Sequence, residues 1–272
     1  MDITTLRKLQ KTELDILVSI DSFCKKYNIT YSLYAGTAIG AVRHHGFIPW
    51  DDDVDICMTR DQFLTFCKVW NKNPVEGYYL ETVMSDPHCG TCHAKVRKNN
   101  TILLSDGEIE SEGHHGIWVD IFPLDKALTS NQDATLKVAR RLILLSRANV
   151  HMANDGFKKK AIRSGIRMIY PEKKRHSEIM KCIKQLSKTD SALQDGYVWK
   201  SLSATYAFKY NFPKTLPDKI TMITFENKEF QIYSDYDKML RIIYGDYMKF
   251  PPESERVCRH NPVKIKFSEV DS

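Results

Sequence analysis

Four aspartates stand within five positions of the segment "WDDDVDI", which begins at residue 50, and this crowding of charge constrains the fold most. The residues alternate as in a strand over 53–58, with Val54 and Ile56 on one face and Asp53 and Asp55 on the other. Two carboxylates that project together repel, so one takes up a proton unless a cation lies nearby. The segment is therefore either a solvated acidic turn or a site for a hard divalent ion.

The remaining composition is that of a globular protein, with 272 residues, 42% hydrophobic and 27% charged. This length favours one large domain over 1–272. The chain contains no run of about 18 apolar residues, and its amphipathic N-terminus lacks the apolar core of a secretory signal. The seven cysteines are scattered. We therefore expect a cytoplasmic protein with free thiols.

Positive charge is concentrated in one segment. Residues 134–188 contain 15 Lys and Arg against three acids, a net charge of +12, whereas the rest of the chain carries −6. Within it Leu136, Ala139 and Ile143 alternate with basic residues at helical spacing, a pattern that can lie on an anionic membrane surface. A solvated group of helices is the alternative. No nucleic-acid-binding motif accompanies the charge, so we expect no nucleic-acid partner.

The periodicity predicts a mixed α/β fold. Helices are expected over 4–27, from a capping box at Thr59 and Gln62, and over 235–244. Two or three more helices are expected in the basic segment, broken at 154–156 and at 170–171. Strands are expected at 30–35, 53–58, 78–83, 93–97, 101–104 and 116–122, with a hairpin at 220–233. The chain then divides into a core (1–125), a basic helical section (126–200) and a closing piece (201–272).

Three further features point to a phosphate-and-metal site. Gly36 and Thr37 follow a strand in a small-residue turn, where backbone N–H groups can approach a phosphate. Asp120 is embedded in the apolar strand "IWVDIF", which is costly without a partner. Lys95 and Arg97 fall on one face of a strand and suit phosphate oxygens. Together these residues predict a third carboxylate and cations beside the paired aspartates.

These residues resemble the nucleotidyltransferase-superfamily pattern. The longer strings "YAGTAIGAVRHHGFIPWDDDVDICMTRDQF", "GIWVDIFPLD" and "FENKEFQIYSDYDKMLRIIYGDYMKFPPESER" are similar to the LicD family of phosphocholine transferases, related to fukutin and fukutin-related protein. The resemblance implies a nucleotidyltransferase-like core with flanking helices and a basic helical insertion. It implies transfer from a CDP-activated alcohol, typically CDP-choline, to a sugar hydroxyl, with CMP leaving. It places metal-binding residues at Asp51, Asp53, Asp55 and Asp120, and leaves Asp52 solvated.

The mechanism expected from this resemblance uses Mg²⁺, with Mn²⁺ as the alternative, on Asp53, Asp55 and Asp120. Asp120 is the candidate acceptor of the hydroxyl proton, because it lies on a separate strand. The phosphates are expected to meet Arg43, Lys95, Arg97 and the Gly36–Thr37 turn. A choline group favours an aromatic face, for which Trp50, Trp118 and Phe122 are candidates. The expected acceptor is a cell-surface glycan precursor such as a teichoic acid or lipopolysaccharide sugar, on a lipid carrier at the inner leaflet.

Other interpretations stay open. A true nucleotidyltransferase, moving a nucleoside monophosphate from a triphosphate, shares the aspartate pattern. A non-catalytic glycan- or membrane-binding protein is the other alternative, although the intact aspartates speak against it. Zinc binding by Cys89 and Cys92 with His88 and His93 lacks a second half-site. The pairs His44–His45 and His114–His115 lie beside the motifs and are candidates to touch substrate. The carried alcohol and the acceptor sugar are left undetermined.

Overall fold

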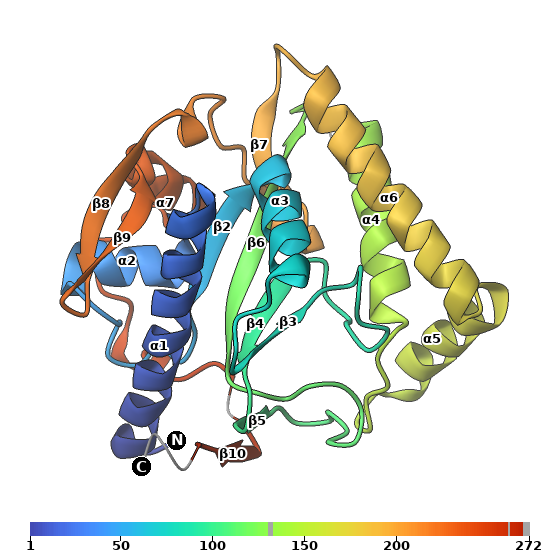
Figure 1. Ribbon diagram of the computed structural model, residues 1–272, viewed down its shortest axis with the longest axis horizontal. Helices are drawn as coiled ribbons and strands as arrows, with labels where there is room; N and C mark the ends of the chain where they lie inside the picture. Colours follow the sequence, from blue (N-terminus) through green and yellow to red (C-terminus); the bar gives the residue numbers. More distant parts are fainter. Residues whose placement is uncertain (130–132, 261, 269–272) are drawn as a thin grey trace.

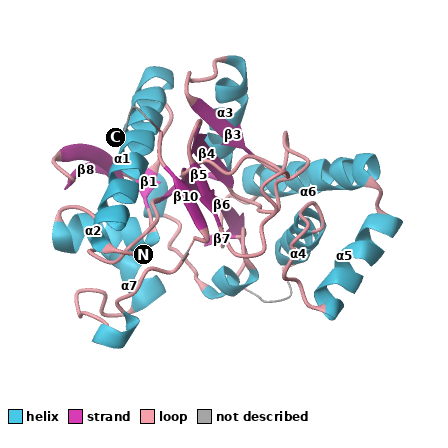
Figure 2. Ribbon diagram, turned by 90° about the horizontal axis from the view of Figure 1, so that it is seen from below, coloured by secondary structure: helices cyan, strands magenta, loops and turns pink. Residues whose placement is uncertain are grey.

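The computed structural model describes residues 1–129, 133–260 and 262–268. The predicted sections 126–200 and 201–272 therefore include a few residues that lie outside the described part. Between two groups of helices stands one mixed sheet, with α1, α2 and α7 on one side and α4, α5 and α6 on the other (Figures 1 and 2). The predicted mixed α/β class is confirmed.

The sheet has the strand order β1-β2-β6-β4-β3, and β7 pairs with the far end of β6. Its central strand, β6 (Trp118–Ala127), pairs in parallel with β2 (Asp55–Thr59) and antiparallel with β4 (Ala94–Lys98). The other members are β1 (Ser32–Leu33), β3 (Tyr78–Glu81) and β7 (Val198–Ser201). Outside this sheet, β5 (Ile102–Leu104) pairs with β10 (Lys264–Lys266).

The predicted first strand is shorter than expected, because a helix takes over its end. β1 stops at Leu33, and α2 (Ala35–His44) begins where the sequence predicted a turn. Ala35 opens this helix with a φ of +46°, in the left-handed region that non-glycine residues rarely adopt. The prediction of a small-residue turn at residues 36–37 is therefore wrong, and these residues form the first turn of α2.

The remaining predicted core helices are present. α1 (Ile3–Tyr27) buries Leu9, Ile16 and Ile20 on one stripe, as its periodicity predicts. α3 (Arg60–Lys72) starts after Thr59, but without a side-chain capping bond, so the predicted capping box is wrong. The oxygen of Gln62 instead accepts a hydrogen bond from the Thr30 amide, at 3.0 Å. The hairpin of β8 (Ile220–Phe225) and β9 (Lys228–Tyr233) leads into α7 (Tyr236–Tyr244).

The basic section forms three helices, α4 (Ala134–Arg147), α5 (Phe157–Ile169) and α6 (Glu172–Ala192). α4 and α6 pack together and enclose a second apolar core, separate from the one under the sheet. Leu136, Ala139 and Ile143 belong to this core and are 0–4% exposed. The prediction that this stretch of α4 faces a membrane is therefore wrong, because its apolar side is already buried. No helix in the described ranges is long and apolar enough to cross a bilayer.

Candidate functional site

The strand pairing places the predicted charged residues in one row. Asp55 on β2 lies opposite Asp120 on β6, and Asp120 lies opposite Lys95 on β4. Residues directly opposite each other share one face of a sheet, so the three side chains project together. The opposite face carries Val54, Ile56, Val96, Val119 and Ile121, all fully buried. The alternation seen in the sequence thus separates a charged face from an apolar one.

A loop before β2 adds more carboxylates to this row. Strand β2 begins at Asp55, so Asp53 belongs to the loop and does not project from the strand as predicted. Oxygens of Asp51, Asp52 and Asp53 nevertheless lie within 4.8 Å of one another, a spacing that a single metal ion can bridge. Among the described residues, no other group of His, Cys, Asp or Glu has this arrangement.

The cluster holds more negative charge than nearby protein cations balance. Burial, and then repulsion from Asp53 and Asp52, raises the pKa of Asp51 to about 8. Burial and neighbouring carboxylates also raise the pKa of Asp53 and of Asp55, the latter well above its usual value. Buried carboxylates with this crowding fit a hard divalent cation, which relieves repulsion that the protein leaves in place.

Asp120 differs from its neighbours because it is already paired. Lys95 Nζ donates to its Oδ1 at 2.7 Å, Trp118 Nε1 donates to its Oδ2 at 2.9 Å, and His93 Nε2 lies 3.0 Å from Oδ1. Burial alone would raise the pKa of Asp120, but Lys95 and His93 hold it far below its usual value. A carboxylate held ionised in this way is a weak base. The contacts therefore favour charge binding over the predicted role as proton acceptor.

The start of α2 supports the cluster from behind. The Asp55 amide donates to Thr37 Oγ1 at 2.8 Å, so the threonine hydroxyl fixes the strand on which Asp55 stands. A Cβ on Gly36 would lie 2.7 Å from Asp51 Oδ2, so only glycine lets this carboxylate approach so closely. The first N–H groups of α2 have no partner inside the helix and carry partial positive charge beside the cluster.

Two predicted phosphate ligands have other contacts. Arg43 lies at the far end of α2, about 10 Å along the helix from Gly36. It donates to the carbonyl of Tyr247 at 2.6 Å and covers the ring of Phe250, so it fastens the segment after α7. Arg97 forms an ion pair with Glu81 and donates to the carbonyl of Gly116 at 3.0 Å. Of the three predicted cations, Lys95 alone contacts an aspartate of the site.

Asp52 has a structural role, although the prediction placed its side chain in solvent. It is 2% exposed and accepts hydrogen bonds from the amides of Arg259 and His260, and its Oδ1 lies 3.2 Å from His260 Nδ1. The hydrogen bond to Asp52 raises the pKa of His260. Asp52 therefore fastens the C-terminal segment over the site, and the prediction that it is solvated is wrong.

Sequence reasoning missed Glu13 on α1. Its carboxyl is 1% exposed, and Oε2 has no hydrogen-bond partner in the described part of the chain. Burial, and then the Asp53, Asp52 and Asp51 charges, raises the pKa of Glu13 well above its usual value, so this acid borders the cluster. Its position on the buried stripe with Leu9 and Ile16 is the signal that could have revealed it, because an acid on an apolar helix face is costly.

The cysteines flanked by histidines do not converge on a zinc site within the described residues. Cys89 contacts Thr91, Cys92 contacts Ser146 Oγ at 3.2 Å, and both thiols are buried. Burial raises the pKa of Cys92 to about 11, so its thiol stays protonated near neutral pH. His93 turns instead to Asp120. The structure gives these side chains packing and positioning tasks, and the zinc interpretation has no support.

Comparison with known proteins connects this arrangement to one family. A family model described as "LicD/FKTN/FKRP, nucleotidyltransferase domain" matches residues 28–144. The lipopolysaccharide cholinephosphotransferase LicD of Haemophilus influenzae is 31% identical over 268 residues, which cover 94% of this chain and 96% of that protein. An uncharacterized protein of Rickettsia typhi is 39% identical over 56 residues, covering 21% of this chain and 18% of its own length.

Proposed function

Because this chain belongs to the LicD family, we propose that it transfers phosphocholine from CDP-choline to a sugar hydroxyl of lipopolysaccharide. The acceptor oxygen forms a bond to the phosphorus that carries choline, the bond from this phosphorus to CMP breaks, and the hydroxyl proton is released. The similarity to a lipopolysaccharide cholinephosphotransferase over nearly the full length of both chains carries this proposal. A teichoic acid sugar as acceptor, or another CDP-alcohol as donor, is the alternative within the same reaction.

Magnesium is proposed as the cofactor, held by Asp51, Asp53, Asp55 and Asp120. The raised pKa of Asp51, Asp53 and Asp55 supports this assignment, because it reflects burial, and then mutual repulsion, of carboxylates that a divalent cation would stabilise in their charged form. Bound there, Mg²⁺ would offset negative charge on the diphosphate. The protein's own contribution is to fix the carboxylates: Thr37 positions Asp55, and Lys95 holds Asp120 ionised.

The choline group is proposed to lie against tyrosines in front of Asp55. Trp118 is unsuited, because Lys95 and Arg97 lie over its ring at 4.2 and 4.9 Å from the centroid. Tyr206 and Tyr244 are instead 73% and 47% exposed as whole residues. Partial desolvation of each phenol group, and then the Asp55 charge, raises the pKa of both tyrosines. A quaternary ammonium beside aromatic rings gains about 0.5 to 2 kcal/mol. Tyr206→Ala is therefore expected to weaken CDP-choline binding while leaving CMP binding unchanged.

Contact with an anionic membrane is proposed through α5. Its Arg163 and Arg167 turn inward and donate to the carbonyl of Val150 at 2.9 and 2.8 Å. Three of its apolar residues turn outward: Phe157, Met168 and Ile169 are 60–87% exposed. An outward apolar face flanked by lysines matches an interfacial helix. Phe157→Ser with Met168→Ser should reduce flotation with anionic liposomes, whereas flotation that is equal with neutral liposomes would refute this contact.

The first experiment compares thermal stabilisation of the protein by CDP-choline, CDP-ethanolamine, CDP-ribitol, CTP, ATP and CMP, with and without Mg²⁺. A ligand at 100 times its Kd adds about 2.7 kcal/mol to the free energy of unfolding. We expect CDP-choline to stabilise the protein only with Mg²⁺, and not to stabilise Asp53→Asn. The surface variant Asp218→Asn serves as the control and should behave as the wild type.

Release of CMP and transfer of phosphocholine to lipopolysaccharide are then measured together. A preference for CTP or ATP would replace the proposal with nucleotidyl transfer. Stabilisation by none of the ligands, together with no choline transfer, would favour a non-catalytic glycan- or membrane-binding protein.

A further inference from the structure

A cavity of about 630 Å³ lies between β4, the loop 105–116 and the helices α4 and α5. This volume lies in the range of pockets that bury small ligands. Lys95 and Arg97 line it from the sheet, and Arg147 and Lys159 line it from the helices. The proposed reaction uses Lys95 but none of the remaining lining, so the cavity needs its own explanation.

Lys95 connects the cavity to the proposed reaction site. Its ammonium lines the cavity and donates to Asp120 Oδ1 at 2.7 Å. The row of paired residues continues from Asp55 through Asp120 and Lys95 to Glu81, which also lines the cavity. Neighbouring strands are about 4.8 Å apart, so the cavity begins about two strands from Asp55. A ligand bound there has a short path to the aspartates.

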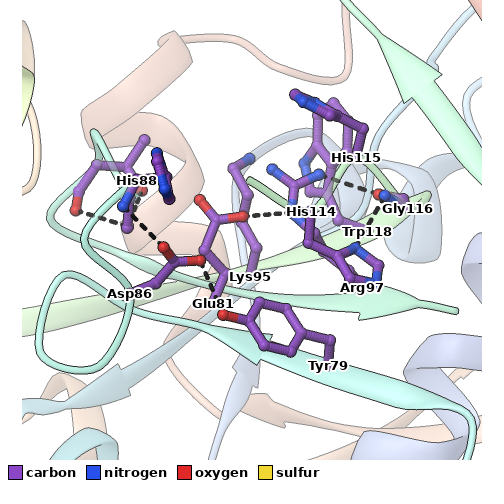
Figure 3. A network of polar contacts seen from close by, with 12 residues as sticks. Tyr79, Glu81, Asp86, His88, Lys95, Arg97, His114, His115, Gly116 and Trp118 are labelled. Carbon is purple, nitrogen blue, oxygen red and sulfur yellow. Dashed lines mark hydrogen bonds and ion pairs between the residues drawn. The ribbon is translucent and has the colours of Figure 1, made fainter. Parts of the chain in front are cut away.

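The sheet side of the cavity is polar and held in place. Glu81, Asp86 and Arg97 are only 5–7% exposed, and Figure 3 shows their side chains gathered with Lys95. Asp86 accepts from the Tyr79 hydroxyl at 2.8 Å and from the His88 amide at 2.7 Å. Fixed carboxylates and a guanidinium offer acceptors and donors at set positions, as sugar hydroxyls require.

The helix side combines apolar surface with unpaired positive charge. Leu144 and Ile162 are 48% and 58% exposed where they line the cavity. In the described part of the chain, no carboxylate forms an ion pair with Arg147 or Lys159. Of the lining acids, Glu81 pairs with Arg97, and Glu112 lies 3.0 Å from His151 Nδ1. Asp86 and Glu108 accept hydrogen bonds from Tyr79 and from the Ser105 amide. Arg147 and Lys159 are thus the lining cations left for an anion in the described part of the chain.

We propose that this cavity binds the acceptor saccharide through a sugar unit that carries a phosphate or carboxylate group. Arg147 and Lys159 pair with that anion, while Glu81, Asp86 and Arg97 contact the hydroxyls. The inference rests on the proposed function and assigns its acceptor side. In the strand order β2, which α2 contacts, is separated by β6 from β4, which lines the cavity. The acceptor can therefore attack the phosphorus from the cavity side while CMP leaves towards α2.

The test uses Arg147→Ala, Lys159→Ala and the double variant, with Lys137→Ala, an exposed lysine of α4 outside the cavity, as the matched control. The probe is lipopolysaccharide core oligosaccharide freed of fatty acids, either with its phosphates intact or after their removal. Calorimetry of oligosaccharide binding needs no catalysis. We expect the double variant to bind the phosphorylated probe about tenfold more weakly or worse, while CDP-choline binding stays unchanged.

In the transfer assay the acceptor KM should rise by the same factor, with kcat within about twofold of the wild type. Wild-type affinity in the double variant, or equal affinity of the wild type for both probes, would overturn the inference. An absence of transfer by the wild-type protein, with the probe still bound through Arg147 and Lys159, would count against the proposed function and support the cavity. Equal losses in Lys137→Ala would show a general charge effect and also overturn it.

Discussion

Strand β6 carries two buried aspartates five positions apart, and they have opposite surroundings. Asp125, 1% exposed, receives two hydrogen bonds from the guanidinium of Arg60, at 2.7 and 2.8 Å. Arg60 itself is 3% exposed, so this pair is sealed from solvent. Asp120 is also buried, at 6% exposed, but beyond its contacts with Lys95 and His93 it adjoins the buried carboxyls of Asp53 and Asp55, whose pKa values are raised by burial and by neighbouring carboxylates.

The contrast separates a structural acid from a functional site. A buried ion pair with matched geometry leaves no charge for a ligand, and its removal exposes the cost of burying the partner. A buried cluster with surplus charge is costly to the apo fold and persists where a ligand offsets that cost. On this basis, substitution of the Arg60–Asp125 pair should mainly lower stability, whereas substitution in the aspartate cluster should mainly lower activity.

The largest change in stability is expected at the buried Arg60–Asp125 ion pair. Arg60→Ala leaves Asp125 buried and without its cation, which should lower the free energy of unfolding by about 3–5 kcal/mol. Urea denaturation of the variant, with exposed Lys68→Ala on the same helix as control, measures this effect. Arg60→Met combined with Asp125→Leu should recover most of the loss. A single variant with wild-type stability would contradict the description of this pair as structural.

A substitution in the aspartate cluster should instead reduce activity and increase stability. Asp55→Asn removes one surplus charge, so we expect choline transfer to fall by about 10²–10³-fold while the Tm at pH 8 rises without Mg²⁺. Because the pKa of Asp55 is raised, the wild-type carboxyl is neutral at low pH, and the gain in Tm should disappear there. Added Mg²⁺ should raise the Tm of the wild type and not that of the variant. A lower Tm of the variant at pH 8 would assign Asp55 a structural role.

A smaller effect on activity is expected from crowding the cluster without changing its charge. Gly36→Ala places a methyl group against Asp51 Oδ2, which must move. Displacement of a supporting group at a metal site typically reduces activity about 10–100-fold. Gly165→Ala in α5, where an added Cβ meets nothing within 4 Å, is the matched control and should keep full activity. Equal activity of both variants would show that the Gly36–Asp51 approach does not matter.

The sequence predicted the parts of this contrast that depend on short-range pattern. Asp53, Asp55 and Asp120 could be proposed as site residues because acids in or beside apolar strands are costly. The predicted basic helices are present, as their helical periodicity indicated. The α2 helix was mistaken for a turn because glycine and a short polar residue after a strand suit both structures. Local pattern cannot distinguish a helix from a turn here, because Asp51, which Gly36 contacts, is 15 residues further along the chain.

Other features depend on contacts that no local pattern reports. Asp52 resembles its neighbours in sequence, yet its partners stand 207 and 208 residues later. Arg97 and Lys95 share a strand face as predicted, but Glu81 on the adjacent strand engages Arg97. The cavity is formed by the packing of α4 and α5 against the sheet region, so it appears only with the tertiary structure.

The smallest expected effect concerns Asp190, a third buried acid, which lies near the Arg60–Asp125 ion pair. Asp190 on α6 is 2% exposed and accepts from the Lys126 amide at 2.8 Å, and burial raises its pKa to about 6. Since the folded pKa exceeds the unfolded value, the stability that this group contributes is greatest below about pH 4 and is lost as pH rises through 6.

Asp190→Asn keeps an oxygen for Lys126 and removes the titration. It should therefore be more stable than the wild type by about 1–2 kcal/mol at pH 7.5 and equal to it at pH 4. Paired urea denaturation curves at the two pH values test this, with choline transfer expected to stay at the wild-type level because Asp190 lies apart from the aspartate cluster. A stabilisation that is the same at both pH values would exclude titration as its cause. Loss of activity would instead assign Asp190 a role in the reaction.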